Sequence, residues 1–375
     1  MNTGQEVVSN TSVSPIVFTD CNNMMALPQE RPHVSERLAA ANVGAGSQSS
    51  KPGAQRREVK VNGKRVKTID VHAHCVIPET LALMGLGRDH QRGPGIDEVG
   101  DRRIREMDAQ GIDVEVLSIN PYWYSADKDK AAEVVRINNE RLVEFSETYP
   151  DRITAFASVA LQFPELAAEQ LEHAVKKLGL KGAAVGASCA GDDFSDPKFL
   201  PFWKKCEDLD VLVFIHPQST PELHKRLKGN GWLANTIGNP LDTTICLSKL
   251  IFEGTLDRHP KLKLCSAHGG GFLPSYAPRS DNACRVGPDQ CNPNIKLSKR
   301  PTEYLRDMYF DTLVFTSEAL RHLAAEVGVN RLVIGTDHPI PWNENPVDHI
   351  MNAPDFTDEE KIAMLGGTAA KLLKM

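Results

Sequence analysis

Eight short runs of β-branched and apolar residues recur along the chain, and longer amphipathic stretches separate them. Each run is short enough to be a strand that is buried on both faces, as the strands of parallel sheets are. The stretches between them have the apolar spacing of helices that cover such a sheet. We predict strands at 66–71, 114–119, 153–158, 182–186, 211–215, 262–267, 308–311 and 332–335, and helices that include 131–148, 164–177, 241–253, 317–327 and 358–373.

Eight strands, each followed by a helix, predict an α/β fold of the (β/α)8 TIM-barrel type. An open doubly wound sheet also fits the alternation, but it more often carries a glycine-rich dinucleotide loop after its first strand. The motif His72-Ala-His74 stands in that place here. The two longest loops, 77–100 and 217–238, follow strands at the rim where barrel enzymes bind substrate, so we expect them to cover it.

The first sixty residues differ in character from the rest. They lack sustained periodicity, and the tract 44–55 is too polar and too rich in glycine and serine to bury a core. We predict a largely irregular N-terminal extension at 1–60 and a single catalytic barrel at 61–375. A flexible arm, an arm that wraps a dimer partner and a mis-assigned start of the chain are all open interpretations of the extension.

Charge and composition narrow the class of partner. The net charge is -6 and no basic stripe stands out, which argues against nucleic acid or an anionic membrane surface and favours a small-molecule substrate. No apolar run approaches the roughly 20 residues that span a bilayer. The eight cysteines lack C-x-x-C spacing and no signal segment opens the chain, so we expect reduced, buried thiols in a cytoplasmic protein.

Histidines and one aspartate stand at the ends of predicted strands. His72 and His74 alternate at the end of the first strand, so both imidazoles point the same way. His216, His268 and Asp337 end the fifth, sixth and eighth strands. Because the strand ends of a barrel meet at one rim, we expect these side chains to converge. Taken singly, each is equally well explained as a hydrogen-bonded histidine or a helix-capping aspartate.

Three neutral imidazoles and one carboxylate suit zinc, and less readily manganese, cobalt or iron. A site for two metals would usually need a bridging ligand, such as a modified lysine at the end of the fourth strand. The lysine beside that strand, Lys181, stands at its other end. We therefore predict one divalent metal ion, Zn²⁺ before Mn²⁺.

Seven segments resemble the amidohydrolase superfamily, and within it the group around 2-amino-3-carboxymuconate-6-semialdehyde decarboxylase. They are IDVHAH at 69–74, RIREMD at 103–108, FIHP at 214–217, PKLKL at 260–264, AHGGG at 267–271, YFDT at 309–312 and IGTDHP at 334–339. The resemblance runs from about residue 68 to the end of the chain. It implies that His72, His74, His216 and Asp337 bind the metal and that His268 is the acid/base histidine.

The resemblance also bears on substrate binding. It implies a homodimer in which Arg279 reaches the substrate carboxylate of the neighbouring subunit, although from the residues alone Arg279 is as readily a surface charge. The loop after the first strand is shorter here than in the decarboxylase, and its Arg88 and Arg92 are candidate substrate-binding residues. Trp232 and Trp342 are candidates to stack on a planar substrate, with packing inside a lid as the alternative.

We interpret the chain as a metal-dependent, non-oxidative decarboxylase of an unsaturated or aromatic carboxylic acid, without an organic cofactor. His268 or Asp337 would deliver the proton that replaces the carboxylate. A hydrolase of a C–C bond, lactone or amide, or a hydratase, is the alternative on the same site. A barrel that only binds metal is a third reading, but it does not need His268 beside a full ligand set.

Overall fold

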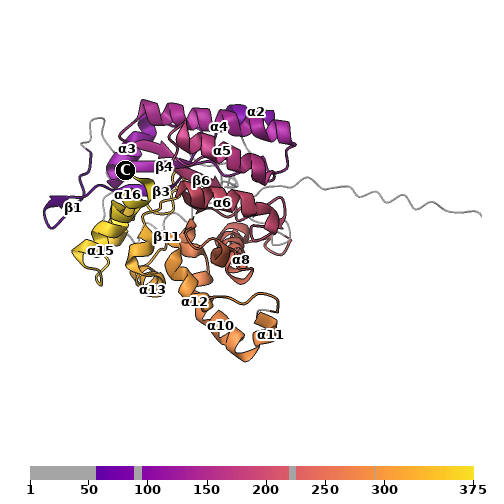
Figure 1. Cartoon of the computed structure of the whole chain (residues 1–375). Coiled ribbons are helices and arrows are strands. Elements are labelled where there is room, and N and C mark those ends of the chain that lie inside the picture. The colour runs from indigo at the N-terminus through magenta and orange to yellow at the C-terminus, as the bar shows by residue number, and fades with distance from the viewer. Residues whose placement is uncertain (1–55, 88–94, 219–224, 292) are drawn as a thin grey trace, which may run out of the picture.

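The computed structural model describes residues 56–87, 95–218, 225–291 and 293–375. In this part of the chain, eight parallel strands lie inside a layer of helices (Figure 1). All eight predicted strands are present, with shifted ends. They are β3 (Ile69–His74), β4 (Val114–Ser118), β5 (Ile153–Ala155), β6 (Gly182–Val185), β9 (Leu212–Ile215), β10 (Lys263–Ser266), β11 (Tyr309–Asp311) and β12 (Leu332–Val333).

The strands form two parallel sheets, one in the order β12-β11-β10-β9-β6 and one in the order β3-β4-β5. The sheets meet at both edges through isolated bridges, between Ala157 and Ala183 at one seam and between Ala73 and His338 at the other. Backbone hydrogen bonds reinforce the seams, including one of 3.0 Å from the Val71 N–H to the Ile334 carbonyl. Hydrogen-bonded contacts therefore link all eight strands, although no continuous ladder spans either seam.

Helices follow the strands as the alternation predicts, and local sequence signals set their ends. The Asp127 side chain accepts a hydrogen bond from the Lys130 N–H at the start of α4, and Thr316 does the same for Ala319 at the start of α13. The longer helices are α3 (Asp101–Gln110), α4 (Lys128–Thr148), α5 (Pro164–Lys176), α6 (Leu200–Leu209), α8 (Asn239–Phe252), α10 (Leu273–Val286) and α13 (Ser317–Val327).

Shorter elements complete the chain. The predicted helix 358–373 is divided into α15 (Asp358–Ile362), a π-helical turn (Ala363–Gly367) and α16 (Thr368–Leu373). The other short α-helices and strands are α2 (Pro78–Leu83), α9 (Thr255–Arg258), α11 (Pro288–Cys291), α12 (Pro301–Tyr304), α14 (Pro346–Met351), the hairpin of β1 (Lys60–Val61) and β2 (Lys64–Arg65), and the pair β7 (Ser188–Cys189) and β8 (Asp192–Asp193).

The predicted bounds of the first strand, 66–71, are wrong, because β3 runs from Ile69 to His74. Val66 belongs to the preceding hairpin, where its N–H donates to the Val59 carbonyl. The strand proper begins at Ile69 and continues through His74, so both histidines lie within β3 rather than after it. The hydrophobic run extended across a turn, and apolar composition alone cannot separate two strands joined in this way.

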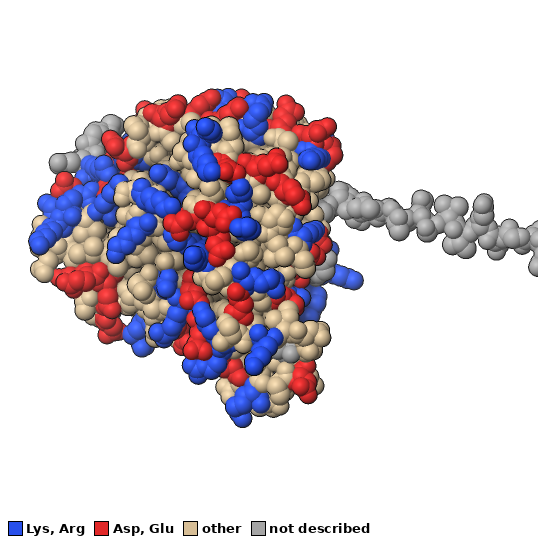
Figure 2. Space-filling view, in the orientation of Figure 1, with Lys and Arg blue, Asp and Glu red and all other residues tan. Residues whose placement is uncertain are grey.

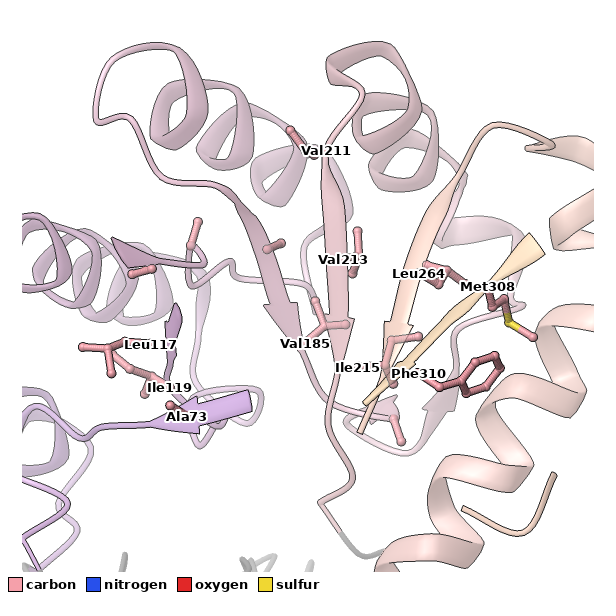
Figure 3. Packing of buried hydrophobic residues seen from close by; sticks show 14 of the residues in the cluster. Ala73, Leu117, Ile119, Val185, Val211, Val213, Ile215, Leu264, Met308 and Phe310 are labelled. Atoms are coloured by element: carbon pink, nitrogen blue, oxygen red, sulfur yellow. The ribbon is translucent and has the colours of Figure 1, made fainter. Parts of the chain in front are cut away.

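The buried residues of most strands are divided between two hydrophobic clusters. On β9, Val213 and Ile215 belong to a cluster that also contains the buried faces of the surrounding helices (Figure 3). Leu212 and Phe214 belong to a second cluster, which is made of strand residues and α16. Because successive side chains of a strand point to opposite faces, most of the helices cover one face, and α16 packs against the residues of the other. His216 continues the series of Leu212 and Phe214 on the other face.

The cysteine prediction is wrong at one place. Cys75, Cys189, Cys206, Cys246 and Cys265 are free and buried, as expected for small core side chains. Cys284 and Cys291, however, are joined as a disulfide between the end of α10 and α11, with Cα atoms 4.9 Å apart. Both are partly buried, and neither belongs to the two hydrophobic clusters of the described residues.

The surface carries both signs of charge. Figure 2 shows lysine and arginine interspersed with aspartate and glutamate on the visible face. No helix in the described ranges is both long enough and apolar enough to cross a membrane. In Figure 1, α10 and α11 project from the rest of the molecule.

Candidate metal centre

Four side chains from distant parts of the chain form one buried cluster. They are His72 and His74 on β3, His216 directly after β9 and Asp337 after β12, and one ligand atom from each lies within 4.8 Å of the others. Each residue is at most 1% exposed. The strand ends therefore bring together the four groups in which the sequence predicted a metal site, and His268 lies beside them.

An irregularity in β3 shapes the cluster. The pairing of β3 with β4 shifts register between Asp70 and Ala73, which is typical of a β-bulge. Bulges often occur beside functional sites because they redirect side chains. His72 and His74 follow with a spacing of two, and their Nε2 atoms lie 3.0 Å apart.

Outer contacts orient both imidazoles. The Nδ1 atom of His72 lies 2.6 Å from the Asp311 carboxylate, which can only accept, so Nδ1 carries the proton. The Nδ1 atom of His74 lies 2.9 Å from the Ser118 hydroxyl. The contact with Asp311 thereby directs the Nε2 atom of His72 into the cluster. A carboxylate that fixes the ring of a ligand histidine is a common feature of metal sites. Of the two roles considered for Asp311, the contact with His72 is the one observed.

The donor set fits a divalent metal ion. The Asp337 Oδ1 atom lies 2.9 Å from the His74 Nε2 atom and 3.3 Å from the His72 Nε2 atom. Ligand atoms about 2.1 Å from a shared ion would lie about 3.0 Å apart at right angles and about 3.4 Å apart at the tetrahedral angle. Nitrogen lone pairs and a carboxylate facing one another at these distances repel unless a cation, or a proton, lies between them.

The pKa values of the cluster residues also indicate that a positive charge stabilises the cluster. Burial lowers the pKa of His72, but the charge of Asp337 and the hydrogen bond with Asp311 outweigh it and raise the pKa to about 10. Burial lowers the pKa of His74 to about 4. Burial raises the pKa of Asp337, but His72 and the neighbouring histidines bring it well below its ordinary value. Without metal, a proton on His72 compensates the buried carboxylate, and a divalent cation would replace that proton.

His268 stands at the edge of the cluster. Its Nε2 atom lies 3.6 Å from the Asp337 Oδ2 atom, its side chain is 16% exposed, and its Nδ1 atom has no hydrogen-bond partner among the described residues. The backbone of His268 has a φ of 54°, and Asp311 accepts hydrogen bonds from the N–H groups of His268 and Gly269. Gly271, with a φ of 66°, passes so close to the Pro240 carbonyl that a Cβ atom would lie 2.2 Å from it.

A pocket of about 360 Å³ opens in front of His268. Its walls are mainly apolar or aromatic, and segment 235–239 adds three polar side chains. The lining includes Asn235, Thr236, Asn239, Phe272, Leu313, Val314, Phe315 and Trp342. A larger hollow of about 1010 Å³ lies between α10 and α12, and none of the cluster residues lines it. The smaller pocket is therefore the one in which a substrate would meet His268.

The structure places the remaining site candidates differently. Trp232 stacks on Trp342 with ring centroids 5.4 Å apart, and only Trp342 lines the pocket. Arg279 is exposed on α10 and is absent from the described lining of the pocket. Arg88 and Arg92 lie outside the described residues. Of the two predicted covering loops, 217–238 contributes Asn235 and Thr236 to the pocket, and 77–100 contains α2.

A buried polar network beneath the cluster was not predicted. The Arg103 Nε atom donates to the Glu115 carboxylate at 2.5 Å, and a second Arg103 nitrogen donates to the His74 carbonyl at 2.9 Å. His338, which follows Asp337, turns away from the cluster and lies 2.6 Å from Glu115 and 3.0 Å from Glu106. The network thus supports the backbone that carries His74. The segment RIREMD contains Arg103, but the sequence does not distinguish this buried arginine from the exposed Arg105 of the same helix.

Replacing Glu115 with glutamine is expected to lower the free energy of unfolding by about 3 kcal/mol at pH 7, because Arg103 loses its buried counter-charge. Although burial raises the pKa of Glu115, Arg103 and His338 lower it from 4.5 to about 2. The ionised carboxylate therefore contributes stability above about pH 4.5, and this contribution is lost as the pH falls toward 2. Urea unfolding at several pH values should show the parent and variant converging on acidification.

The matched control is Glu140→Gln. Glu140 pairs with Arg136 on the surface of α4, where both side chains are more than half exposed. That substitution should cost less than about 1 kcal/mol at pH 7. Equal effects of the two substitutions would contradict a structural role for the buried network.

Known proteins resemble this chain in sequence and in fold. The profile of the family described as Amidohydrolase matches residues 69–375. The 2-amino-3-carboxymuconate-6-semialdehyde decarboxylase of Dictyostelium discoideum is 32% identical over 276 residues, which are 73% of this chain and 76% of that protein. The gamma-resorcylate decarboxylase of Rhizobium sp. (strain MTP-10005) is 31% identical over 293 residues, 74% of this chain and 88% of that protein.

A solved structure extends the comparison. The dihydroxybenzoic acid decarboxylase of Polaromonas sp. JS666, with bound manganese and the inhibitor 2-nitroresorcinol, superimposes with a TM-score of 0.71 at 26% identity. The superposition covers 82% of this chain and 97% of that one. The similarity therefore extends over nearly the whole length of a protein that holds a metal ion.

Proposed function

This chain belongs to the amidohydrolase family, and on that premise we propose that it is a metal-dependent, non-oxidative decarboxylase of an aromatic or unsaturated carboxylic acid. The main observation in support of this function is that a buried set of possible metal ligands lies beside a partly exposed His268. The ligands are His72, His74, His216 and Asp337. The relatives that cover most of the chain are named as decarboxylases, which supports the same reaction.

The fold proposed for this enzyme is a closed (β/α)8 barrel spanning 61–375, with 1–60 as an extension. The hydrogen bonds at both seams between the two sheets support closure. A cytoplasmic location is proposed on the five buried free thiols, although the disulfide of Cys284 and Cys291 is unusual for that compartment.

One divalent ion is proposed for the site, zinc on the borderline character of three imidazoles and one carboxylate. Manganese is the alternative, because the dihydroxybenzoic acid decarboxylase holds that ion. When bound, the ion acts as a Lewis acid that fixes the substrate carboxylate or an adjacent hydroxyl group. His72, His74, His216 and Asp337 would hold it, with Asp311 and Ser118 orienting two of the imidazoles.

The other residues bind the substrate and move a proton. Phe272, Leu313 and Trp342 form apolar walls that suit a planar ring. A proton is transferred to the ring carbon that bears the carboxylate, from His268 or from Asp337. The bond between this carbon and the carboxylate then breaks, its electron pair returns to the ring, and carbon dioxide leaves. The partly exposed position of His268 at the pocket favours it as the residue that exchanges protons with solvent.

Substrate contacts from a second subunit are part of the proposal. Tyr276 and Val286 on the projecting helix α10 are 64% and 73% exposed, and Arg279 lies between them. Contact with a second subunit would remove these apolar side chains from water. We propose a homodimer in which Arg279 reaches the partner's substrate, while Arg88, Arg92 and Trp232 act from the loops of the same subunit.

The reaction is tested by following carbon. The metal-loaded protein should release one carbon dioxide per product from 2,6-dihydroxybenzoate or a related hydroxylated benzoate. The organic product should contain no oxygen from labelled water. The corresponding benzamide should be inert. Ammonia release from the amide, or solvent oxygen in the product without carbon dioxide, would instead make the chain a hydrolase or hydratase.

A further inference from the structure

The indole of Trp342 contacts a residue of the metal cluster. Its Nε1–H donates a hydrogen bond of 2.7 Å to the Asp337 Oδ2 atom. The backbone between the two residues turns back on itself, since the Ile340 N–H donates to the Asp337 carbonyl and the Trp342 N–H donates to the Ile340 carbonyl. An indole N–H can only donate, so it holds Oδ2 as an acceptor.

The two oxygens of Asp337 consequently face different partners. Oδ1 lies toward the Nε2 atoms of His72 and His74, at 3.3 and 2.9 Å. Oδ2 lies toward the indole of Trp342 at 2.7 Å and toward the Nε2 atom of His268 at 3.6 Å. The shorter and better-placed donor to Oδ2 is therefore the tryptophan rather than the histidine.

The same tryptophan ring is a wall of the pocket. Trp342 lines the cavity together with His268, and its ring stacks on Trp232 at 5.4 Å and contacts Phe315 at 6.2 Å between centroids. Packing by these two neighbours limits the orientation of the indole. One side chain thus connects the apolar wall of the pocket with the carboxylate of the cluster.

We propose that Trp342 is a positioning residue, which turns Asp337 so that Oδ1 faces the metal and which occupies Oδ2 so that His268 stays available to the substrate. The part of this inference that concerns His268 rests on the proposed decarboxylase function. The part that concerns the metal does not, because binding of the ion requires no turnover.

The test compares Trp342→Phe with Trp232→Phe. The first substitution keeps an aromatic ring in the wall and removes the N–H donor, whereas the second changes the stacking partner. On metal-stripped protein, competition with a chromogenic chelator should give a Kd for Zn²⁺ that is about 10- to 100-fold higher in Trp342→Phe. Trp232→Phe should stay within about twofold of the parent. Thermal unfolding of the metal-free proteins checks that both variants are folded.

Turnover gives an independent readout. In the presence of enough metal to saturate each protein, Trp342→Phe should lower kcat about tenfold with little change in KM, because His268 then donates to Oδ2 instead of serving the substrate. Parent-like metal affinity in folded Trp342→Phe would overturn the proposal, as would an equal loss of affinity in both variants. Weakened metal binding without any decarboxylation would refute the proposed function and retain the positioning role.

Discussion

Replacing His268 with alanine is expected to reduce carbon dioxide release by about 10²- to 10⁴-fold while the metal content of the protein stays near that of the parent. The reason is geometric. His268 lies 3.6 Å from Asp337 and faces the pocket, but it is not among the four residues whose ligand atoms converge. Steady-state kinetics and elemental analysis on the same preparation measure both quantities.

His322→Ala is the matched control. His322 is an exposed histidine on α13 whose Nε2 atom contacts the Ser275 hydroxyl, and it belongs neither to the metal cluster nor to the described lining of the pocket. Its replacement should leave both turnover and metal content unchanged. If His268→Ala lost the metal as well, His268 would have to be counted as a ligand, and its assignment as the proton donor would fail.

Replacing His72 with alanine is expected to weaken metal binding by at least about 100-fold and to abolish measurable turnover. This substitution removes a buried ligand nitrogen and also leaves the Asp311 carboxylate without the Nδ1–H that it accepts. Removal of an outer partner alone typically costs 10- to 100-fold in metal affinity, so loss of the ligand itself should cost at least as much. Metal per chain after dialysis and the Kd of the stripped protein measure the effect.

Asp311→Asn provides a graded comparison. This variant keeps the ligand nitrogen but removes the charge that orients the His72 ring, and it should weaken metal binding by about 10- to 100-fold. Added metal should restore turnover in Asp311→Asn and not in His72→Ala. Full metal content in His72→Ala would contradict the proposed ligand set.

The order of strands and helices was accessible from the sequence because burial imposes periodicity on each element separately. Runs buried on both faces identify the strands, and a 3.6-residue spacing identifies helices such as α13, whose bounds agree with the predicted 317–327. The first strand was predicted too early in the chain, because the apolar run that contains Val66 begins in the β1–β2 hairpin that precedes β3. Periodicity describes the surroundings of a segment and not the partner with which it pairs.

The sequence also predicted which metal ligands converge, because parallel strands bring their carboxyl ends to one edge. These ligands are His72, His74, His216 and Asp337. The sequence could not predict contacts that depend on the direction of side chains from distant parts of the fold. The burial of Arg103 against Glu115, the hydrogen bond from Trp342 to Asp337 and the disulfide between Cys284 and Cys291 are of this kind.

By itself, then, the sequence determined the type of fold, the chemistry of the donor set and the end of the strands at which it lies, because these depend on residue type and on local repeats. The tertiary structure decided which oxygen of Asp337 faces the imidazoles, which carboxylate orients His72 and which tryptophan lines the pocket. These features depend on distances of a few ångströms between residues far apart in the chain, and only the packed backbone sets such distances.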